Sequence, residues 1–247
     1  MSAVTRLDLM ALFWFVLASG GFAFLVDHSP LKVRSLSHAM QRQRFAWMEM
    51  MARREVRIVD TAIMSGLQNG TAFFASTSVL AIGGAFALLN STDRMIAIFA
   101  DLAVPIGATR VLWELKGLGL VLIYAYAFFK FGWSYRLFNY TSILLGAVPP
   151  PDEVDTAEGR RALARVSEMA VNAGMHFNLG LRAFFLSIGY LGWFAGPIPF
   201  MAATALIILV LIRRQFWSNP IFPALAAMRE AAAHGPGNSD DERPASR

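Results

Sequence analysis

The stretch that decides the fold is GLGLVLIYAYAFFKFGWSYRLFNYTSILLGAV, residues 117–148. It is long and apolar enough to cross a bilayer, which takes about 20 predominantly apolar residues. Two cations, Lys130 and Arg136, nevertheless lie inside it. Because an ionisable side chain at membrane depth is costly, it reaches the interface, pairs with another group or serves a function. The segment therefore predicts a transmembrane helix and also a set of charges that needs an explanation.

The composition extends the membrane prediction to the whole chain. Of its 247 residues, 56% are hydrophobic and only 16% are charged, whereas an average soluble domain has about 25% charged residues. The chain has no cysteine, which excludes disulfides, thiolate catalysis and cysteine-ligated metals. The net charge of +5 favours loops that face anionic lipid headgroups over a nucleic-acid partner.

Long apolar runs predict an all-α fold of about four transmembrane helices. The expected spans cover residues 9–26, 61–89, 117–138 and 183–212. Gly-Pro-Ile-Pro at 196–199 divides the last run, and each half is too short to cross alone, so we predict one kinked helix and not a hairpin. Residues 1–229 then form a single membrane domain, and residues 230–247 form a disordered tail.

The segments between the spans are more polar. Residues 27–60 combine many basic residues with apolar residues spaced three to five apart, which indicates a loosely amphipathic helix. With Trp47, this helix either lies along the headgroup surface or forms a solvated extension of the next span. Residues 152–182 predict a polar helical loop.

The distribution of basic residues predicts the orientation. Residues 31–60 and 149–182 carry eleven Lys or Arg, against seven on the opposite side of a four-span topology. Cytoplasmic loops carry the excess of Lys and Arg. We therefore expect both of these loops in the cytoplasm and both chain termini outside.

Four alternating spans bring the end of the third span to the same side as the starts of the second and fourth. We therefore expect one polar cluster, formed by Asp60, Lys130, Arg136, Asn139, His176, Asn178 and Arg182. Asn178 and Arg182 are four residues apart and share a helix face. Asp60 is the carboxylate expected to pair with Arg136 or Arg182, and Glu168 is a weaker candidate.

Two interpretations of this cluster remain open. In the first, the cations extend to the headgroups and only anchor their helices, while the amides join neighbouring helices. In the second, the cluster is a cationic pocket for an anionic lipid headgroup or a small anion, to which the planar fork of Arg is suited. No HExxH, Walker, GxSxG or GxGxxG pattern occurs in context, so we expect no enzyme, no cofactor and no metal.

Several stretches together resemble a known family. Arg44, Trp47-Met48 and the run from Arg53 to Asp60 precede FFASTSVLAIGG at 73–84, FFKFGWSYRLFNY at 128–140 and FNLGLRAFFLSIGYLGWF at 177–194. This combination resembles an uncharacterised membrane-protein family of bacteria and plants, catalogued as domain of unknown function 599, over about residues 5–225. The resemblance implies a multi-span membrane protein, and it brings no active-site residues.

The leading functional hypothesis is a non-enzymatic protein of the bacterial inner membrane that binds anionic lipid or serves as a structural or assembly subunit. Expected partners are membrane lipids and either a second copy or a membrane-complex subunit. The alternative is an oligomeric channel or transporter for a small anionic solute, favoured by the Ser/Thr-rich run at 61–89 and the Gly-Pro-Ile-Pro break. An enzyme would require His176, Asp60 and Glu168 to converge in one pocket.

Overall fold

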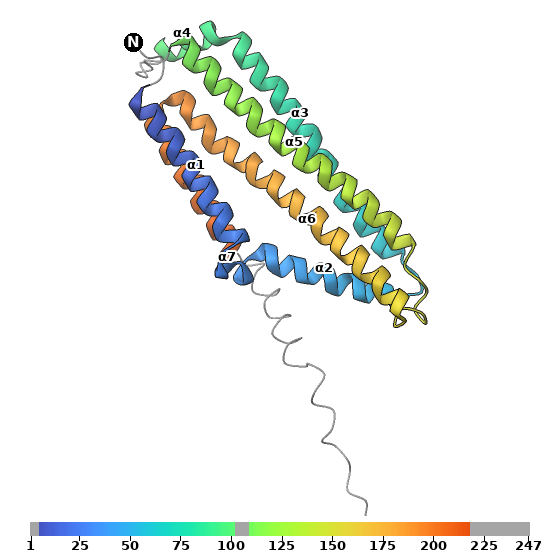
Figure 1. Ribbon diagram of the computed structural model, residues 1–247. Coiled ribbons are helices and arrows are strands. Elements are labelled where there is room, and N and C mark those ends of the chain that lie inside the picture. Colours follow the sequence, from blue (N-terminus) through green and yellow to red (C-terminus); the bar gives the residue numbers. More distant parts are fainter. Residues whose placement is uncertain (1–4, 102–108, 218–247) are drawn as a thin grey trace, which may run out of the picture.

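The computed structural model of the chain describes residues 5–101 and 109–217, where every regular element is a helix (Figure 1). Four helices are long and apolar enough to cross a membrane: α1 (Arg6–Asp27), α3 (Ile58–Asn90), α5 (Arg110–Gly146) and α7 (Pro197–Phe216). The other elements are η1 (Pro30–Arg34), α2 (Leu36–Ala52), α4 (Thr92–Asp101), α6 (Ala157–Leu191) and η2 (Gly192–Ala195). The predicted all-α membrane fold is confirmed. The tail predicted over 230–247 lies outside the described residues.

The prediction of one kinked helix over residues 183–212 is wrong. α6 runs for 35 residues and ends at Leu191, and α7 begins at Pro197 and returns beside it (Figure 1). Gly196 turns the chain with a φ of 127°, a conformation that favours glycine. Pro197 then occupies the start of α7, where a missing N–H needs no partner. The Gly-Pro-Ile-Pro sequence therefore joins two helices of a hairpin.

The charged residues of α6 conceal its buried face, which explains why residues 152–182 predicted only a polar loop. Small residues dominate that face, and they include Gly159, Ala162, Ala170, Ala173, Gly174, Gly180 and Ala183. Small residues let neighbouring helices approach closely. A Cβ on Gly180, for example, would lie 2.7 Å from the Phe131 ring of α5. α6 therefore packs along α5 without the long apolar run that marks a span in sequence.

The hairpin also fixes the direction of α7, which runs parallel to α1. Trp14 Nε1 of α1 donates a hydrogen bond of 3.3 Å to the Met201 carbonyl oxygen, in the first half of both helices. Phe22 and Leu211, further along the same two helices, belong to one buried cluster. The parallel arrangement means that α1 and α7 end on the same side of the molecule.

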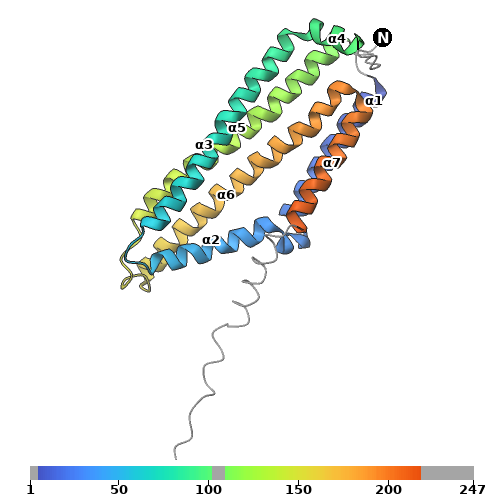
Figure 2. The same cartoon turned by 180° about the vertical axis from the view of Figure 1, so that it is seen from behind.

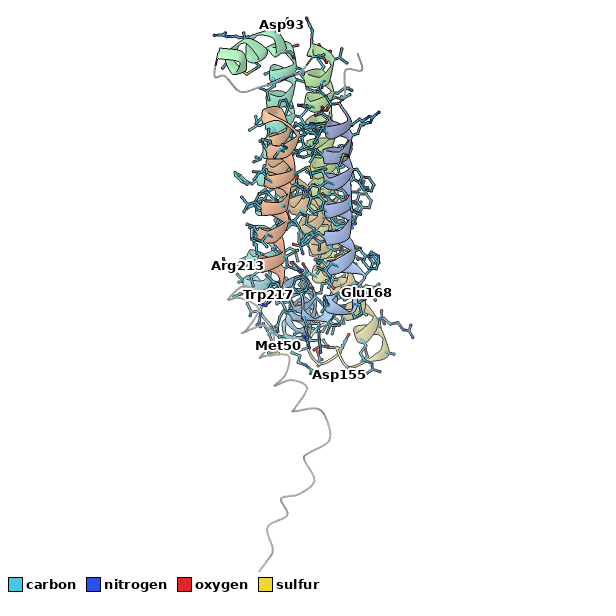
Figure 3. All side chains as sticks on the ribbon, turned by 90° about the vertical axis from the view of Figure 1, so that its left-hand side faces the viewer. Met50, Asp93, Asp155, Glu168, Arg213 and Trp217 are labelled. Carbon is cyan, nitrogen blue, oxygen red and sulfur yellow. The ribbon has the colours of Figure 1, made fainter. Side chains whose placement is uncertain are left out.

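The described part of the chain therefore begins and ends at opposite ends of the bundle. Figure 3 shows Arg213 and Trp217 at the same end as Met50 of α2 and Asp155 of the α5–α6 turn, with Asp93 at the other end. The expectation that both ends of the chain lie on one side is wrong for the described residues. The physical reason is the α6–α7 hairpin, which adds one more passage along the bundle.

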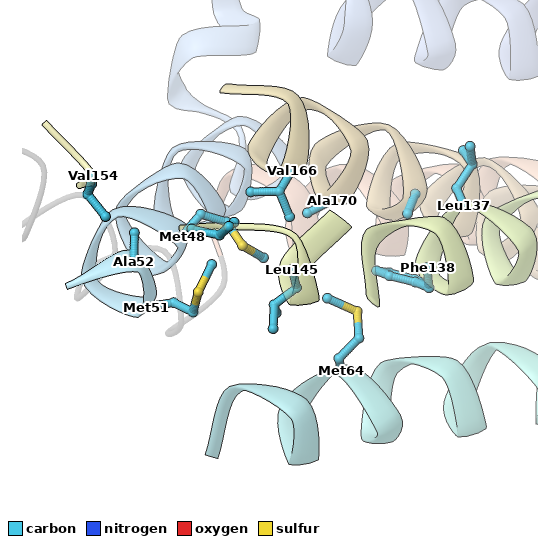
Figure 4. Packing of buried hydrophobic residues seen from close by; sticks show 12 residues of the cluster. Met48, Met51, Ala52, Met64, Leu137, Phe138, Leu145, Val154, Val166 and Ala170 are labelled. Carbon is cyan, nitrogen blue, oxygen red and sulfur yellow. The ribbon is translucent and has the colours of Figure 1, made fainter. Parts of the chain in front are cut away.

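α2 is a separate helix that lies across one end of the bundle (Figures 1 and 2). Met48 and Met51 are completely buried, in a cluster that includes Met64 of α3 and Val166 of α6 (Figure 4). On its opposite face, Met50 is 57% exposed. Residues 53–57 separate α2 from α3, so the interpretation of this segment as an extension of the next span is wrong. An amphipathic helix before the second span is present.

A buried charge at the opposite end was not anticipated. Lys116 of α5 is only 2% exposed, and its Nζ donates a hydrogen bond of 2.8 Å to the Trp193 carbonyl oxygen. The Trp193 ring in turn donates from Nε1 to Asp8 Oδ1 of α1, also at 2.8 Å. This chain of contacts joins α1, α5 and η2 where the hairpin begins.

Candidate functional site: a basic cavity between α1, α2, α6 and α7

Arg182 and Asp27 form the central ion pair of the site. The guanidinium of Arg182 on α6 donates from both terminal nitrogens to the two carboxylate oxygens of Asp27 on α1, at 2.6 and 2.9 Å. It also lies 5.6 Å from the Phe22 ring centroid. This two-point geometry is the strong form of an Arg–carboxylate contact, and it holds the end of α1 against α6.

A cavity of about 150 Å³, here called the basic cavity, lies beside this pair. Four helices line it, α1, α2, α6 and α7. Its polar lining consists of Ser37, Arg44, Asn178, Arg182, Arg214 and Gln215. Its apolar lining consists of Phe22, Leu36, Met40, Leu181, Phe185 and Leu211. Three guanidinium groups therefore share one cavity whose walls are half apolar.

Arg44 reaches the basic cavity from α2 across the surface of α6. Its guanidinium lies where a side chain on Gly174 would be, since a Cβ built there would come 2.3 Å from Arg44 Cζ. Among the described residues, the buried Arg44 Nη1 has no hydrogen-bond partner. Burial lowers the pKa of the Arg44 guanidinium below its ordinary value, as desolvation without a counter-charge does. An Arg side chain stays protonated in proteins, and no carboxylate in the described ranges forms an ion pair with this one.

Two residues at the end of α7 add further donors. Gln215 Nε2 is buried and, like Arg44 Nη1, finds no partner in the described part of the chain. The Arg214 guanidinium lies 5.6 Å from the Phe185 ring centroid, at an exposed position. Buried donors without partners are costly and rare in native proteins. Two residues that line the basic cavity, Arg44 and Gln215, each carry one such donor.

A second cavity of about 550 Å³ adjoins the first and shares Ser37, Asn178 and Arg182 with it. Its further polar lining is Asp27, His28, Lys32, His38 and Gln41. Asp27 is the carboxylate among the residues that line the two cavities, and it is already paired with Arg182. Both cavities are therefore predominantly basic.

Asp60 lies outside this site and pairs locally. It is completely buried, and its Oδ1 accepts from Arg54 at 2.7 Å and from Trp47 Nε1 at 2.8 Å. The expected pairing of Asp60 with Arg136 or Arg182 is wrong. Arg54 lies in the short connection between α2 and α3, which places its guanidinium beside the Asp60 carboxylate. Asp60 fixes the start of α3 against α2.

Lys130 and Arg136, the two cations of the opening stretch, contact aromatic rings of their own helix. Lys130 Nζ lies 5.3 Å from the Tyr126 ring centroid. Arg136 donates from Nε to the Tyr140 hydroxyl at 2.6 Å and lies 5.8 Å from the Trp133 ring centroid. Neither residue lines the two cavities. The geometry agrees with cations that anchor a helix near the interface.

The remaining predicted residues divide between helix packing and the cavity. Asn139 accepts a hydrogen bond of 2.9 Å from Gln68 Nε2, which joins α5 to α3. His176 lies 6.4 Å from the Trp133 ring, centroid to centroid, and lines neither cavity. Asn178 and Arg182, placed on one helix face by their spacing, both line the basic cavity. The structure thus brings together two of the seven predicted residues.

Sequence reasoning missed Arg44, Arg214 and Gln215. Arg44 was visible as part of the basic segment 31–60, but nothing in its spacing pointed to a residue on α6. A single span over residues 183–212 places Arg214 on the side opposite to residues 31–60, whereas the α6–α7 hairpin returns it to their side. The observed direction of α7 groups Arg213 and Arg214 with the other basic residues. The distribution of Lys and Arg in the sequence therefore favours this direction.

The described residues also bear on the geometry of a metal site and of a pore. No group of three His, Asp or Glu side chains in this part of the chain could hold a metal ion. Thr71, Thr77 and Ser78 of α3, which suggested a pore, donate to carbonyl oxygens one turn earlier on α3 itself, at 2.7–2.8 Å. The Gly-Pro-Ile-Pro break is a hairpin turn and not an unwound site within a span.

Comparison with known proteins identifies the family. The family described as "Protein of unknown function, DUF599" matches residues 10–220. The chain belongs to this family. No curated protein and no solved structure matches it. The resemblance drawn from the sequence motifs is therefore confirmed.

Proposed function

We propose that this chain is a non-enzymatic integral protein of the bacterial inner membrane that binds an anionic lipid headgroup in the basic cavity. The observation that carries the proposal is a pair of buried donors, Arg44 Nη1 and Gln215 Nε2, which belong to two residues that line one cavity and have no partners among the described residues. An anionic oxygen would satisfy both. Guanidinium groups bind phosphate oxygens through paired, charge-assisted hydrogen bonds.

The surroundings of the cavity favour a lipid over a soluble anion. Half of its lining is apolar, and Leu211 and Phe22 continue into a buried cluster between α1 and α7. An acyl chain could follow this apolar side while the headgroup meets the cations. The cavity also lies at the end of the bundle that carries the basic α2, where anionic lipids and Lys/Arg-rich segments attract each other.

The corrected topology strengthens the proposed orientation. Arg213 and Arg214 lie at the same end as α2 and the α5–α6 turn (Figure 3). With them, most Lys and Arg residues of the described loops and helix ends lie on one side. The opposite side holds Arg6, Arg94, Arg110 and Lys116. The bias supports a cytoplasmic position for the α2 end.

Native mass spectrometry of the purified full chain tests the proposal. The protein is extracted into detergent and offered equal amounts of phosphatidylglycerol and phosphatidylcholine. We expect retention of phosphatidylglycerol, and a loss of about tenfold or more in Arg44→Gln, because a charged hydrogen bond is worth about 1.5–3 kcal/mol. Arg136→Gln is the matched control, since it removes a cation outside the cavities. Equal retention of both lipids, or an equal loss in both variants, would overturn the proposal.

A further inference from the structure

Among the described residues, the basic cavity has more positive than negative charge around it, and the excess indicates the charge of a suitable ligand. Arg182 is compensated by Asp27 through two hydrogen bonds. Arg44 and Arg214 form no ion pair with a carboxylate in the described ranges. The cavity therefore presents two uncompensated positive charges to whatever occupies it.

Anionic headgroups differ in the charge that they can offer. A phosphodiester such as phosphatidylglycerol carries one negative charge. A phosphate monoester carries about −1.5 to −2 near pH 7 and ends in three strong acceptor oxygens. One monoester therefore balances both uncompensated guanidinium groups, whereas one diester, with a single negative charge, balances only one of them.

The donors of the cavity also match three terminal oxygens. The guanidinium groups of Arg44 and Arg214 come from different helices, α2 and α7, and Gln215 Nε2 adds a neutral donor next to Arg214. Donors from separate helices can surround a group with three free oxygens. A diester has two such oxygens and a second substituent that also needs space. The cavity volume of about 150 Å³ is several times what one water molecule needs and suits a compact terminal group.

We infer that the basic cavity selects the phosphate monoester headgroup of a lipid over phosphodiester headgroups, with Arg44 and Arg214 as the two residues that set this preference. The inference rests on the proposed function and narrows its ligand to one chemical class. Asp27 contributes indirectly, because its pairing with Arg182 keeps the uncompensated charge at two.

The α7 terminus provides a matched pair of variants for the test. Arg213 and Arg214 are adjacent and both exposed, but only Arg214 lines the cavity. Arg214→Gln and Arg213→Gln thus remove the same charge from the same helix end. Removing one of the two uncompensated cations should weaken a doubly charged ligand more than a singly charged one.

The experiment measures retention of phosphatidic acid, phosphatidylglycerol and phosphatidylcholine by the full chain at pH 7.5, with and without excess inorganic phosphate. We expect phosphatidic acid to be retained about tenfold or more over phosphatidylglycerol, as the loss of one charged contact implies. The preference should shrink severalfold in Arg214→Gln and persist in Arg213→Gln.

The other outcomes separate this inference from the function on which it rests. Equal retention of phosphatidic acid and phosphatidylglycerol, both above phosphatidylcholine, would overturn the monoester preference and leave anionic-lipid binding intact. An equal change of the preference in both Arg variants would overturn the role of Arg214. Binding of inorganic phosphate with no retention of any anionic lipid would overturn both proposals, because the ligand would then be a soluble anion.

Discussion

Gly174 and Arg44 occupy one position on the surface of α6: the glycine supplies the backbone, and the guanidinium of Arg44 fills the space of the missing side chain. A Cβ on Gly174 would lie 2.3 Å from Arg44 Cζ and 2.6 Å from both terminal nitrogens. The nearest atoms belong to the far end of a flexible side chain and not to the backbone. The glycine therefore determines where a charge lies and has little effect on whether α6 forms.

This relationship makes Gly174→Ala a selective variant. Alanine favours the helix by up to about 1 kcal/mol relative to glycine, so α6 should remain intact. The added methyl group displaces the Arg44 guanidinium, and we expect anionic-lipid retention to fall about tenfold, since charged hydrogen bonds of about 1.5–3 kcal/mol are lost. Native mass spectrometry with phosphatidylglycerol measures the effect. Gly132→Ala is the control, because a Cβ there meets no neighbouring atom within 4 Å. Unchanged retention in Gly174→Ala would contradict the role of Arg44.

Removing the Asp27 carboxylate should change stability and binding in opposite directions. Asp27→Asn breaks the pair that holds α1 to Arg182, and we expect the free energy of unfolding to fall by about 1–3 kcal/mol. The released Arg182 adds positive charge to the cavity, so an added anionic lipid should raise the melting temperature more than it does in wild type.

Thermal unfolding in detergent, with and without phosphatidic acid, checks both effects of Asp27→Asn. Asp155→Asn is a suitable control, because its 3.5 Å pair with Arg53 leaves both side chains more than 60% exposed. Such surface pairs contribute about 0–1 kcal/mol. A smaller lipid-dependent stabilisation in Asp27→Asn than in wild type would contradict the assignment.

The contacts around Trp193 should contribute to stability and not to lipid binding. Asp8→Ala removes the acceptor of the Trp193 ring and a carboxylate that interacts electrostatically with buried Lys116. We expect a loss of about 1–3 kcal/mol in the free energy of unfolding, because the buried Trp193 Nε1 is left without its acceptor. Asp93→Ala, whose pair with Arg110 is exposed, should change little. A loss of lipid retention in Asp8→Ala at a temperature where the protein stays folded would show that the two ends of the bundle are coupled.

The hairpin topology predicts which positions share a side of the membrane. Because the chain has no cysteine, single cysteines at Met50, Asp155, Trp217 and Asp93 can be labelled without background. A membrane-impermeant thiol reagent should reach the first three from one side and position 93 from the other. We expect the shared side to be the cytoplasm. Labelling of position 217 from the side of position 93 would contradict the direction of α7.

The sequence predicted α1, α3 and α5 well, because a long apolar run is a direct physical requirement for crossing lipid. The hydropathy of the sequence does not predict α6 as a separate long helix of the bundle, and the reason is also physical. Its buried face consists largely of glycine and alanine, which pack closely but contribute little hydropathy, and Arg160, Arg161 and Arg165 lower the average further. Without α6 as a separate helix, Gly196 and the two prolines predict a kink within one span.

The site was predictable only where its residues are close in sequence. The four-residue spacing of Asn178 and Arg182 placed both on one helix face, and both line the basic cavity. Arg44 and Arg214 are 170 positions apart in the chain, and only the hairpin brings both to the lining of one cavity. The long-range partner predicted for Asp60 is wrong because Arg54, only six residues away, donates a hydrogen bond to its carboxylate.

The central claim is that uncompensated guanidinium groups in the basic cavity hold an anionic lipid. Its most direct test is the number of phosphatidylglycerol or phosphatidic acid molecules that each folded chain retains after purification, compared between wild type and the double variant Arg44→Gln/Arg214→Gln. The account predicts about one tightly held anionic lipid per wild-type chain and loss of that lipid in the double variant. The same occupancy in both proteins would contradict it.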